Sequence, residues 1–238
     1  MKCNGLYFIG KFKERPNRFL ANVEIETTER SKMVVEAHVP DPGRLKELLL
    51  LNAQVILRKT SNQNRKTQYS LIGVKKGKIW VNIDSYITNR LFKEEYLNIL
   101  RFHGYIISKS EFTYGRSRFD FLMYNENTHQ NALIEVKSVT LVKKGVALFP
   151  DAPTLRGTKH IMDLMSAVKE YQCFIVFIIK RNDAVAFKPN ENIDYTFSQA
   201  LVASIQKGVQ VCAVKCQYDP IEKKELSILD EVPLILYD

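Results

Sequence analysis

The chain has 238 residues, of which 45% are hydrophobic and 26% are charged, a balance typical of a folded protein with one large or two small domains. No apolar run approaches the roughly 20 residues of a transmembrane helix, and the start lacks the apolar core of a signal peptide, so we expect a cytoplasmic protein with no membrane contact. The formal net charge of +9 indicates a polyanionic partner and suits a neutral sugar poorly.

The surplus of positive charge lies in the first third of the chain. Residues 1–83 contain 16 Lys/Arg and 7 Asp/Glu, whereas residues 84–238 contain 19 of each kind. We therefore expect the N-terminal third to contact a nucleic acid, either DNA or RNA. The alternative is a basic surface that only keeps the protein soluble.

Residues 1–83 are predicted to form an OB-fold-like small β-barrel. Five short strands with one short helix at Gly43–Leu51 fit this fold. The strands are expected at Phe19–Ile25, Met33–Val39, Gln54–Arg58, Tyr69–Val74 and Ile79–Ile83. The residues of this domain expected to bind nucleic acid lie in or near its loops and are Arg18, Arg44, Arg65 and Lys66. Phe19 either stacks on bases or belongs to the barrel core.

From about residue 84 the pattern changes to alternating helices and strands. Helices are expected at Thr88–His103, Leu155–Tyr171 and Asp194–Lys207, strands at Phe174–Ile179 and Val209–Gln217, a loop at Val142–Thr154, and a β-hairpin between residues 118 and 138. This order predicts an α/β domain over residues 84–238 with a central mixed sheet, in which helices cover the sheet.

The hairpin carries the chemistry. Arg118–Leu122 and Leu133–Ser138 are strand-like and are joined by the polar stretch Asn125–Asn131. Since side chains alternate along a strand, Glu135 and Lys137 should share one face.

A Glu-x-Lys tripeptide alone carries little information, because about one copy is expected by chance in a chain of this length. The sequence holds a second copy at Glu222–Lys224, in a charged stretch that reads as a solvated turn. The copy at Glu135 interrupts an apolar strand, where charges are costly unless paired or bound to metal. The alternative is a half-exposed hairpin with a cross-strand ion pair.

The residue types suit metal-dependent phosphodiester hydrolysis. Mg²⁺, or Mn²⁺ in its place, prefers oxygen ligands and keeps several waters, so Asp120, Glu135 and the carbonyl group of Val136 suffice as protein ligands. Lys137 would orient the attacking water and offset the charge of the phosphate. This pattern is the core of the restriction-endonuclease-like, or PD-(D/E)xK, nuclease site.

Other residues extend this hypothesis. Glu94, on the preceding helix, either adds an acidic group or faces solvent. Arg156 and Lys159, at the start of the next helix, are expected to grip phosphate, and Arg118 to contact nucleic acid. His160 is expected to pack locally.

The ordered motifs of the chain resemble those of the sugar fermentation stimulation protein A family. They are Asn17–Ala21, Pro40–Leu45, Asn89–Glu94, Tyr114–Phe121, Glu135–Leu141 and Phe149–His160, and they span nearly the whole sequence. The resemblance implies an N-terminal OB-fold joined to a PD-(D/E)xK-type domain, DNA binding with a role in regulating sugar metabolism genes, and Glu94, Asp120, Glu135 and Lys137 as the nuclease-like site. The chain departs from the family at Asp41, where an Asn is usual, and this added negative charge weakens the assignment of that loop to nucleic acid.

Two functions follow from the sequence. The first is a Mg²⁺-dependent nuclease that acts on duplex or single-stranded DNA or on RNA. The second is a DNA-binding regulator of sugar metabolism genes that uses a nuclease-derived fold without catalysis. A helix-turn-helix motif is not apparent, so base-specific reading of the major groove has little support.

Overall fold

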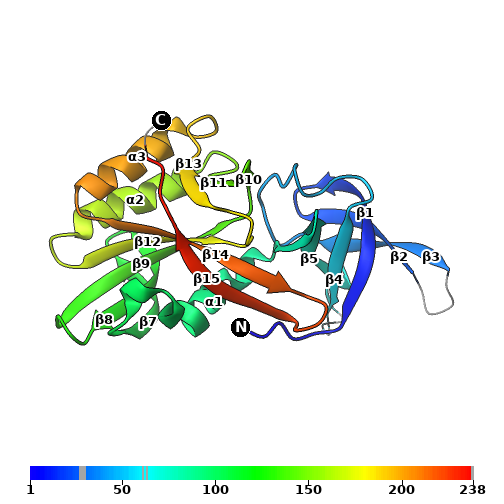
Figure 1. The fold of residues 1–238 in the computed structure, drawn as a ribbon, viewed down its shortest axis with the longest axis horizontal. Helices are drawn as coiled ribbons and strands as arrows, with labels where there is room; N and C mark the ends of the chain where they lie inside the picture. The colour runs from blue at the N-terminus through cyan, green and yellow to red at the C-terminus, as the bar shows by residue number, and fades with distance from the viewer. Residues whose placement is uncertain (27–30, 61, 63, 237–238) are drawn as a thin grey trace.

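Two β-sheet domains follow each other along the chain and lie side by side (Figure 1). The computed structural model describes residues 1–26, 31–60, 62 and 64–236. Among these residues no helix is long and apolar enough to cross a membrane.

The first domain is a closed five-stranded barrel. Its strands pair in the order β3-β2-β1-β4-β5, and parallel pairing of β3 with β5 closes the ring. The sheet consists of β1 (Tyr7–Asn17), β2 (Leu20–Glu26), β3 (Lys32–His38), β4 (Gln54–Lys59), β5 (Tyr69–Lys76) and β6 (Ile79–Asn82), and β6 pairs antiparallel with β5. This arrangement confirms the predicted OB-fold.

Two elements of the barrel differ from the sequence prediction. The expected helix at Gly43–Leu51 is a series of turns, because Leu45 has a positive φ of 50° that an α-helix cannot include. Leu45 and Leu48 are still buried, so the segment closes one end of the barrel core. Strand β1 was not predicted, since its Lys and Glu residues and its register shifts against β2 hide the alternation.

The second domain is built on a mixed sheet, as predicted, and this sheet has six strands, of which four were expected. Its order is β15-β14-β12-β9-β8-β7, with β9, β12 and β14 parallel and the remaining pairs antiparallel. The strands are β7 (Tyr105–Tyr114), β8 (Ser117–Asn125), β9 (Gln130–Val139), β12 (Gln172–Ile179), β14 (Gln210–Asp219) and β15 (Glu225–Val232). A small sheet of β10 (Val142–Lys143), β11 (Val146–Phe149) and β13 (Ala186–Pro189) stands beside it.

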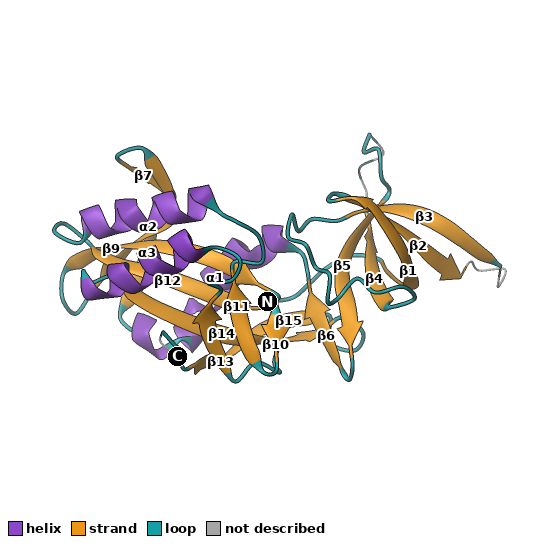
Figure 2. Ribbon diagram, turned by 90° about the horizontal axis from the view of Figure 1, so that it is seen from above, coloured by secondary structure: helices purple, strands orange, loops and turns teal. Residues whose placement is uncertain are grey.

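Helices cover both faces of this sheet. The helices α2 (Leu155–Ala167) and α3 (Tyr195–Gln206) pack side by side on one face (Figure 2). The helix α1 (Thr88–Glu95) packs on the other face. The central strand β12 lies between two parallel neighbours and is buried along nearly its full length, which explains its continuous apolar sequence.

The predicted helix Thr88–His103 is too long. The helix ends at Glu95, and two 3₁₀ turns, Tyr96–Asn98 and Leu100–Phe102, follow around Ile99, which has extended dihedral angles. This break lets Ile99 and Phe102 both enter the core. The prediction of a loop at Val142–Thr154 was incomplete, because the short strands β10 and β11 lie within this segment.

Several contacts fix the two domains against each other. The ammonium group of Lys180 is fully buried and donates to the carbonyl oxygen of Asp84 (2.5 Å) and to Oδ1 of Asn82 (3.3 Å). The backbone N–H of Arg44 donates to Oδ2 of Asp151 (2.9 Å) across the junction. Met1 also reaches the second domain, where its N-terminal ammonium pairs with a glutamate of α1. The barrel is therefore held in one orientation beside the sheet.

Candidate functional site

The predicted hairpin is present as β8 and β9. Its antiparallel ladder runs from Asn125↔Gln130 to Phe121↔Ile134 and ends there. One more step in the same register would pair Asp120 with Glu135. The strands separate at the position where the two carboxylates stand.

Strand β8 is also irregular at this position on its other side. Phe119 packs in the core beneath α2 and Phe121 in the core beneath α1, although residues two apart on a regular strand share a face. On β7, the residue opposite Asp120 is Glu111, which has a positive φ of 57°. Such local distortion often re-aims a side chain beside a functional site, and here it frees Asp120 from the regular ladder.

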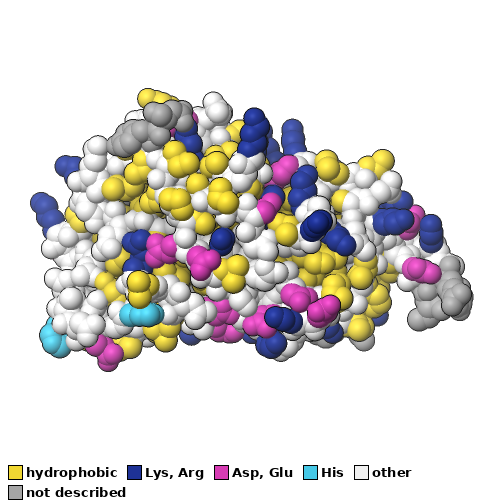
Figure 3. All heavy atoms as spheres, viewed as in Figure 1, with side chains coloured by type: hydrophobic (Ala, Val, Ile, Leu, Met, Phe, Trp, Pro, Cys, Tyr) yellow, Lys and Arg dark blue, Asp and Glu magenta, His cyan; other side chains and the backbone are white. Residues whose placement is uncertain are grey.

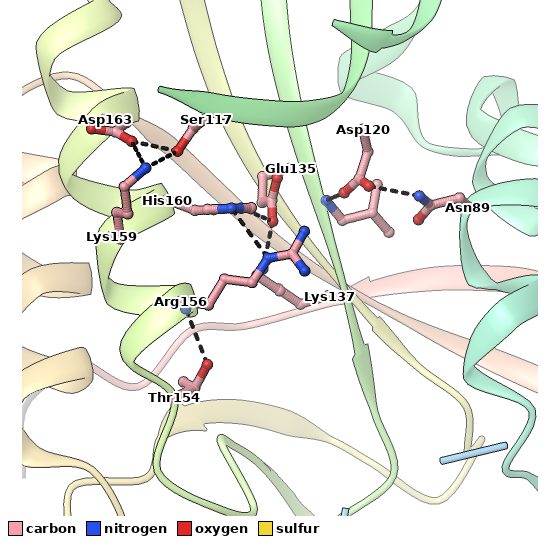
Figure 4. A network of polar contacts seen from close by, with 12 residues as sticks. Asn89, Ser117, Asp120, Glu135, Lys137, Thr154, Arg156, Lys159, His160 and Asp163 are labelled. Atoms are coloured by element: carbon pink, nitrogen blue, oxygen red, sulfur yellow. Dashed lines mark hydrogen bonds and ion pairs between the residues drawn. The ribbon is translucent and has the colours of Figure 1, made fainter. Parts of the chain in front are cut away.

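The side chain of Asp120 provides the acceptor for the Val136 N–H, beyond the point where the β8–β9 ladder ends. Its Oδ2 accepts a hydrogen bond from the N–H of Val136 (2.7 Å), and its Oδ1 accepts one from Nδ2 of Asn89 on α1 (2.6 Å) (Figure 4). Burial, with a further contribution from the negative charge of Glu135, raises the pKa of Asp120 to about 6. Its charge is therefore incompletely compensated by the protein.

Glu135 is 4% exposed and is held on one oxygen only. Its Oε1 accepts from Nζ of Lys137 (2.5 Å) and lies 2.6 Å from Nδ1 of His160. Its Oε2 is buried and has no hydrogen-bond partner among the residues that the structure describes. Burial alone would raise the pKa of Glu135, but the hydrogen bond from His160 and the charge of Lys137 outweigh it and hold the pKa below its ordinary value. A charged carboxylate with a vacant buried oxygen results.

Helix α2 brings His160 to this carboxylate and Arg156 to His160. The helix starts after Thr154, whose Oγ1 accepts from the N–H of Gly157 (3.0 Å). Nε of Arg156 lies 3.5 Å from Nε2 of His160, so the first turn of the helix faces the site (Figure 4). The sequence prediction that His160 packs locally was wrong. No sequence signal marks its contact with a strand 25 positions earlier.

The remaining predicted residues are placed as follows. Asp120, Glu135, Lys137 and the N–H of Val136 come together, with Arg156 nearby (Figure 4). Glu94 does not join them, because its carboxylate pairs with Arg90 (2.6 Å) while α1 presents Asn89 to Asp120.

The predicted nucleic-acid-binding residues fall into two groups. Four of them have partners within the protein: Arg156 donates to His160 (3.5 Å), Lys159 donates to Asp163 and Ser117, Arg118 pairs with Glu111 (3.6 Å), and Arg65 donates to Ser70 (3.5 Å). Arg18, Arg44 and Lys66 are exposed on the barrel. Of the residues with partners, only Lys159 and Arg118 would have to break an ion pair within the described part of the chain before neutralising a phosphate.

The described part of the chain contains no cluster of three or more His, Cys, Asp or Glu side chains that could hold a metal. A metal ion at this site would therefore need ligands from water as well as from Asp120 and Glu135. Two carboxylates, one with a vacant buried oxygen and the other with a raised pKa, fit an ion that completes its coordination with water.

Comparison with known proteins places the chain in a family. A family model described as the SfsA N-terminal OB domain matches residues 14–83, and one described as the sugar fermentation stimulation protein RE domain matches residues 84–222. The sugar fermentation stimulation protein homolog of Clostridium beijerinckii is 41% identical over 237 residues, covering 99% of this chain and all of the relative. The homolog of Desulfitobacterium hafniense is 42% identical over 209 residues, covering 87% of this chain and 88% of the relative.

The fold has also been seen in a solved structure. The structure of Pyrococcus furiosus SfsA in complex with Ca²⁺ superposes with a TM-score of 0.86 at 25% identity, and 99% of each chain is covered. The two matched family models together span both domains of the present structure. The chain belongs to the sugar fermentation stimulation protein family.

Proposed function

We propose that the protein is a Mg²⁺- or Mn²⁺-dependent nuclease whose barrel binds DNA while the hairpin of the second domain cuts it. The observation that carries this proposal is the juxtaposition of Asp120, Glu135 and Lys137 at the point where β8 and β9 separate, with one carboxylate oxygen buried and without a partner. Leaving such an oxygen without a partner costs about 1–3 kcal/mol, and functional sites are where proteins retain such costs.

Asp120 and Glu135 would hold the metal ion, together with the Val136 carbonyl group. A bound ion of this kind lowers the pKa of a coordinated water and offsets the charge of a phosphate. The Lys137 ammonium group can orient the attacking water or donate to a phosphate oxygen. Arg156, at the start of α2, stands where a second phosphate oxygen could be bound. The related protein of Pyrococcus furiosus was solved with Ca²⁺, an ion that shares the oxygen preference of Mg²⁺.

The basic barrel supplies affinity in this proposal. Its positive surplus favours a phosphate backbone of DNA or RNA without selecting a sequence. Lys and Arg side chains gather on the face of the molecule where the loops of the barrel meet the region around β10 (Figure 3). This face runs from the barrel toward the second domain.

One observation favours the second function, a DNA-binding regulator without catalysis. Both oxygens of Asp120 already accept hydrogen bonds, and Lys137 and His160 both engage Oε1 of Glu135. Such a site is largely satisfied by the protein's own groups. Cleavage separates the two functions, whereas DNA binding is common to both.

The test is a cleavage panel of single-stranded, duplex and flapped DNA and of RNA, with Mg²⁺, with Mn²⁺ and with a chelator. We expect metal-dependent cutting of at least one substrate, and its loss in Glu135→Gln and in Lys137→Ala with binding retained. Glu222→Gln and Lys224→Ala are matched controls, since they carry the same spacing in an exposed turn. Unchanged cutting by Glu135→Gln would refute the assignment of the site. No cutting by the wild type on any substrate would favour the regulator.

A further inference from the structure

Three exposed or half-exposed rings belong to segments that meet near the junction of the two domains. Tyr86 is 73% exposed and Phe19 is 52% exposed, and the half-buried His38 lies between them in the sequence. The His38 and Tyr86 rings are stacked, with centroids 6.3 Å apart and planes inclined by 13°. Nδ1 of His38 lies 3.2 Å from the carbonyl oxygen of Phe19. We call Phe19, His38 and Tyr86 the aromatic strip.

Isolated surface aromatics are common and need no explanation. The strip differs because its rings come from three separate segments: the turn between β1 and β2, the end of β3, and the 3₁₀ turn Ser85–Ile87 that precedes α1. The hydroxyl group of Ser85 donates to the carbonyl oxygen of Pro40 (2.5 Å), which holds that turn against the barrel. The strip is thus a supported surface.

Positive charge lies beside the Phe19 end of the strip. The guanidinium group of Arg18 lies 5.8 Å from the centroid of the Phe19 ring, and Arg18 and Arg44 are both exposed. Arg15 fixes their loops by donating to the carbonyl oxygens of Arg18 (2.5 Å) and Arg44 (2.9 Å). Aromatic faces among cationic side chains are the combination that binds unpaired nucleic acid strands.

The strip also leads to the candidate site. Tyr86 stands three residues before Asn89, whose amide donates to Asp120. On the barrel side, the N–H of Arg44 bonds to Asp151 of the loop that precedes α2. A strand laid along the strip from Phe19 to Tyr86 would therefore arrive at the segment that positions Asp120.

We propose that the aromatic strip binds single-stranded nucleic acid by stacking its bases on Phe19, His38 and Tyr86, and that it delivers an unpaired strand to the hairpin. The proposal rests on the proposed function and names its substrate class. Bases of a duplex are stacked on each other and cannot cover these rings, whereas every unpaired base has a free face. Stacking of this kind contributes about 1–3 kcal/mol per base irrespective of sequence.

The experiment measures the affinity of the full chain for a fluorescein-labelled single strand and for a duplex of the same length by anisotropy, with chelator present so that nothing is cut. We expect Phe19→Ala and Tyr86→Ala to weaken single-strand binding about 5- to 100-fold and to weaken duplex binding much less. Tyr86→Phe should restore binding, because its ring keeps the stacking face. Tyr195→Ala removes a tyrosine that is 64% exposed on α3, outside the strip, and is the matched control.

The proposal would be overturned if the Phe19→Ala and Tyr86→Ala variants lost affinity equally for single strand and duplex, or lost none. It would also be overturned if the wild type did not bind a single strand. Thermal melting of each variant shows whether it is folded, and the Tyr86→Phe rescue separates loss of the ring from loss of structure. Failure of the strip is distinguishable from failure of the nuclease. A Tyr86→Ala protein that binds normally refutes the strip while the wild type still cuts, and a wild type that cuts nothing still shows its strand preference in the binding assay.

Discussion

Nδ1 of His160 lies 2.6 Å from Oε1 of Glu135, and this contact ties the start of α2 to the middle of β9. Both side chains are nearly fully buried. The imidazole ring also meets Phe119 edge to face, at a centroid distance of 5.9 Å. The ring is thus fixed on two sides, and it holds the Glu135 carboxylate with one oxygen engaged and the other vacant.

Removal of this ring should loosen the carboxylate. We expect His160→Ala to lower the free energy of unfolding by about 1–3 kcal/mol, because a buried acceptor loses a partner, and to weaken Mg²⁺ binding about 10-fold or more, as loss of groups that orient a metal ligand does. Urea denaturation and a Mg²⁺ titration followed by thermal shift measure the two effects. His129→Ala, in the exposed hairpin turn, is the control. Wild-type values of both quantities in His160→Ala would contradict the positioning role.

Asp120→Asn should stabilise the metal-free protein. The pKa of Asp120 is raised, so its charged form is disfavoured in the folded state, and wild-type stability falls as the pH rises from the ordinary value of 3.8 to about 6. The amide oxygen still accepts from the Val136 N–H without the charge, and the Asn89 amide, turned by half a rotation, accepts from the new NH2 group. We expect a gain of about 1–2 kcal/mol at neutral pH with chelator present, a flatter pH dependence, and no stabilisation by added Mg²⁺. A Mg²⁺-induced rise in melting temperature equal to that of the wild type would remove Asp120 from the metal site.

Substitution of Arg15 should lower stability, whereas substitution of its exposed neighbours Arg18 and Arg44 should weaken DNA binding. Arg15 donates to four backbone carbonyl groups, those of Arg18, Asp41, Gly43 and Arg44. We expect Arg15→Met to lower the free energy of unfolding by about 2–4 kcal/mol. Arg18→Ala and Arg44→Ala should leave it unchanged and each reduce the slope of log affinity for DNA against log salt by about 1. Chemical denaturation and salt-dependent anisotropy measure these outcomes; a stable Arg15→Met protein would show that the loops do not depend on this side chain.

The sequence was sufficient for the parts of the site that depend on local periodicity. Alternation along β9 places Glu135 and Lys137 on the face with Leu133 and Val139, while Ile134 and Val136 enter the other core, as the period of 2 predicts. The duplicate Glu222–Lys224 lies in an exposed turn between β14 and β15, as its charged surroundings predict.

The parts that depend on long-range packing could not be predicted. The hydrogen bond between Asp120 and Val136 depends on the distortion of β8 opposite Glu111, which has a left-handed backbone conformation. The sequence around Glu111 looks like that of an ordinary exposed strand and does not reveal this conformation. His160 reaches Glu135 only through the packing of α2 on β9. Likewise, α1 ends at Glu95 because Ile99 and Phe102 are drawn into the core, a tertiary effect that overrides local helix propensity.

The buried ammonium group of Lys180 predicts how the junction of the domains responds to pH. Burial lowers the pKa of Lys180 to about 8 from its ordinary value of 10.5, against the opposing charges of Asp84 and Asp41. Between these two pH values the unfolded chain binds the proton and the folded protein releases it, so this residue makes the protein more stable as the pH rises. We expect Lys180→Met to abolish that contribution.

The measurement is the free energy of unfolding at several pH values from about 7.5 to about 10.5. The difference between wild type and variant is taken, so that the contributions of other titrating groups cancel. Lys207→Met, at an exposed position at the end of α3, is the matched control and should show a constant difference. A wild-type minus Lys180→Met difference that does not rise with pH would mean that the ammonium group is not desolvated at the junction.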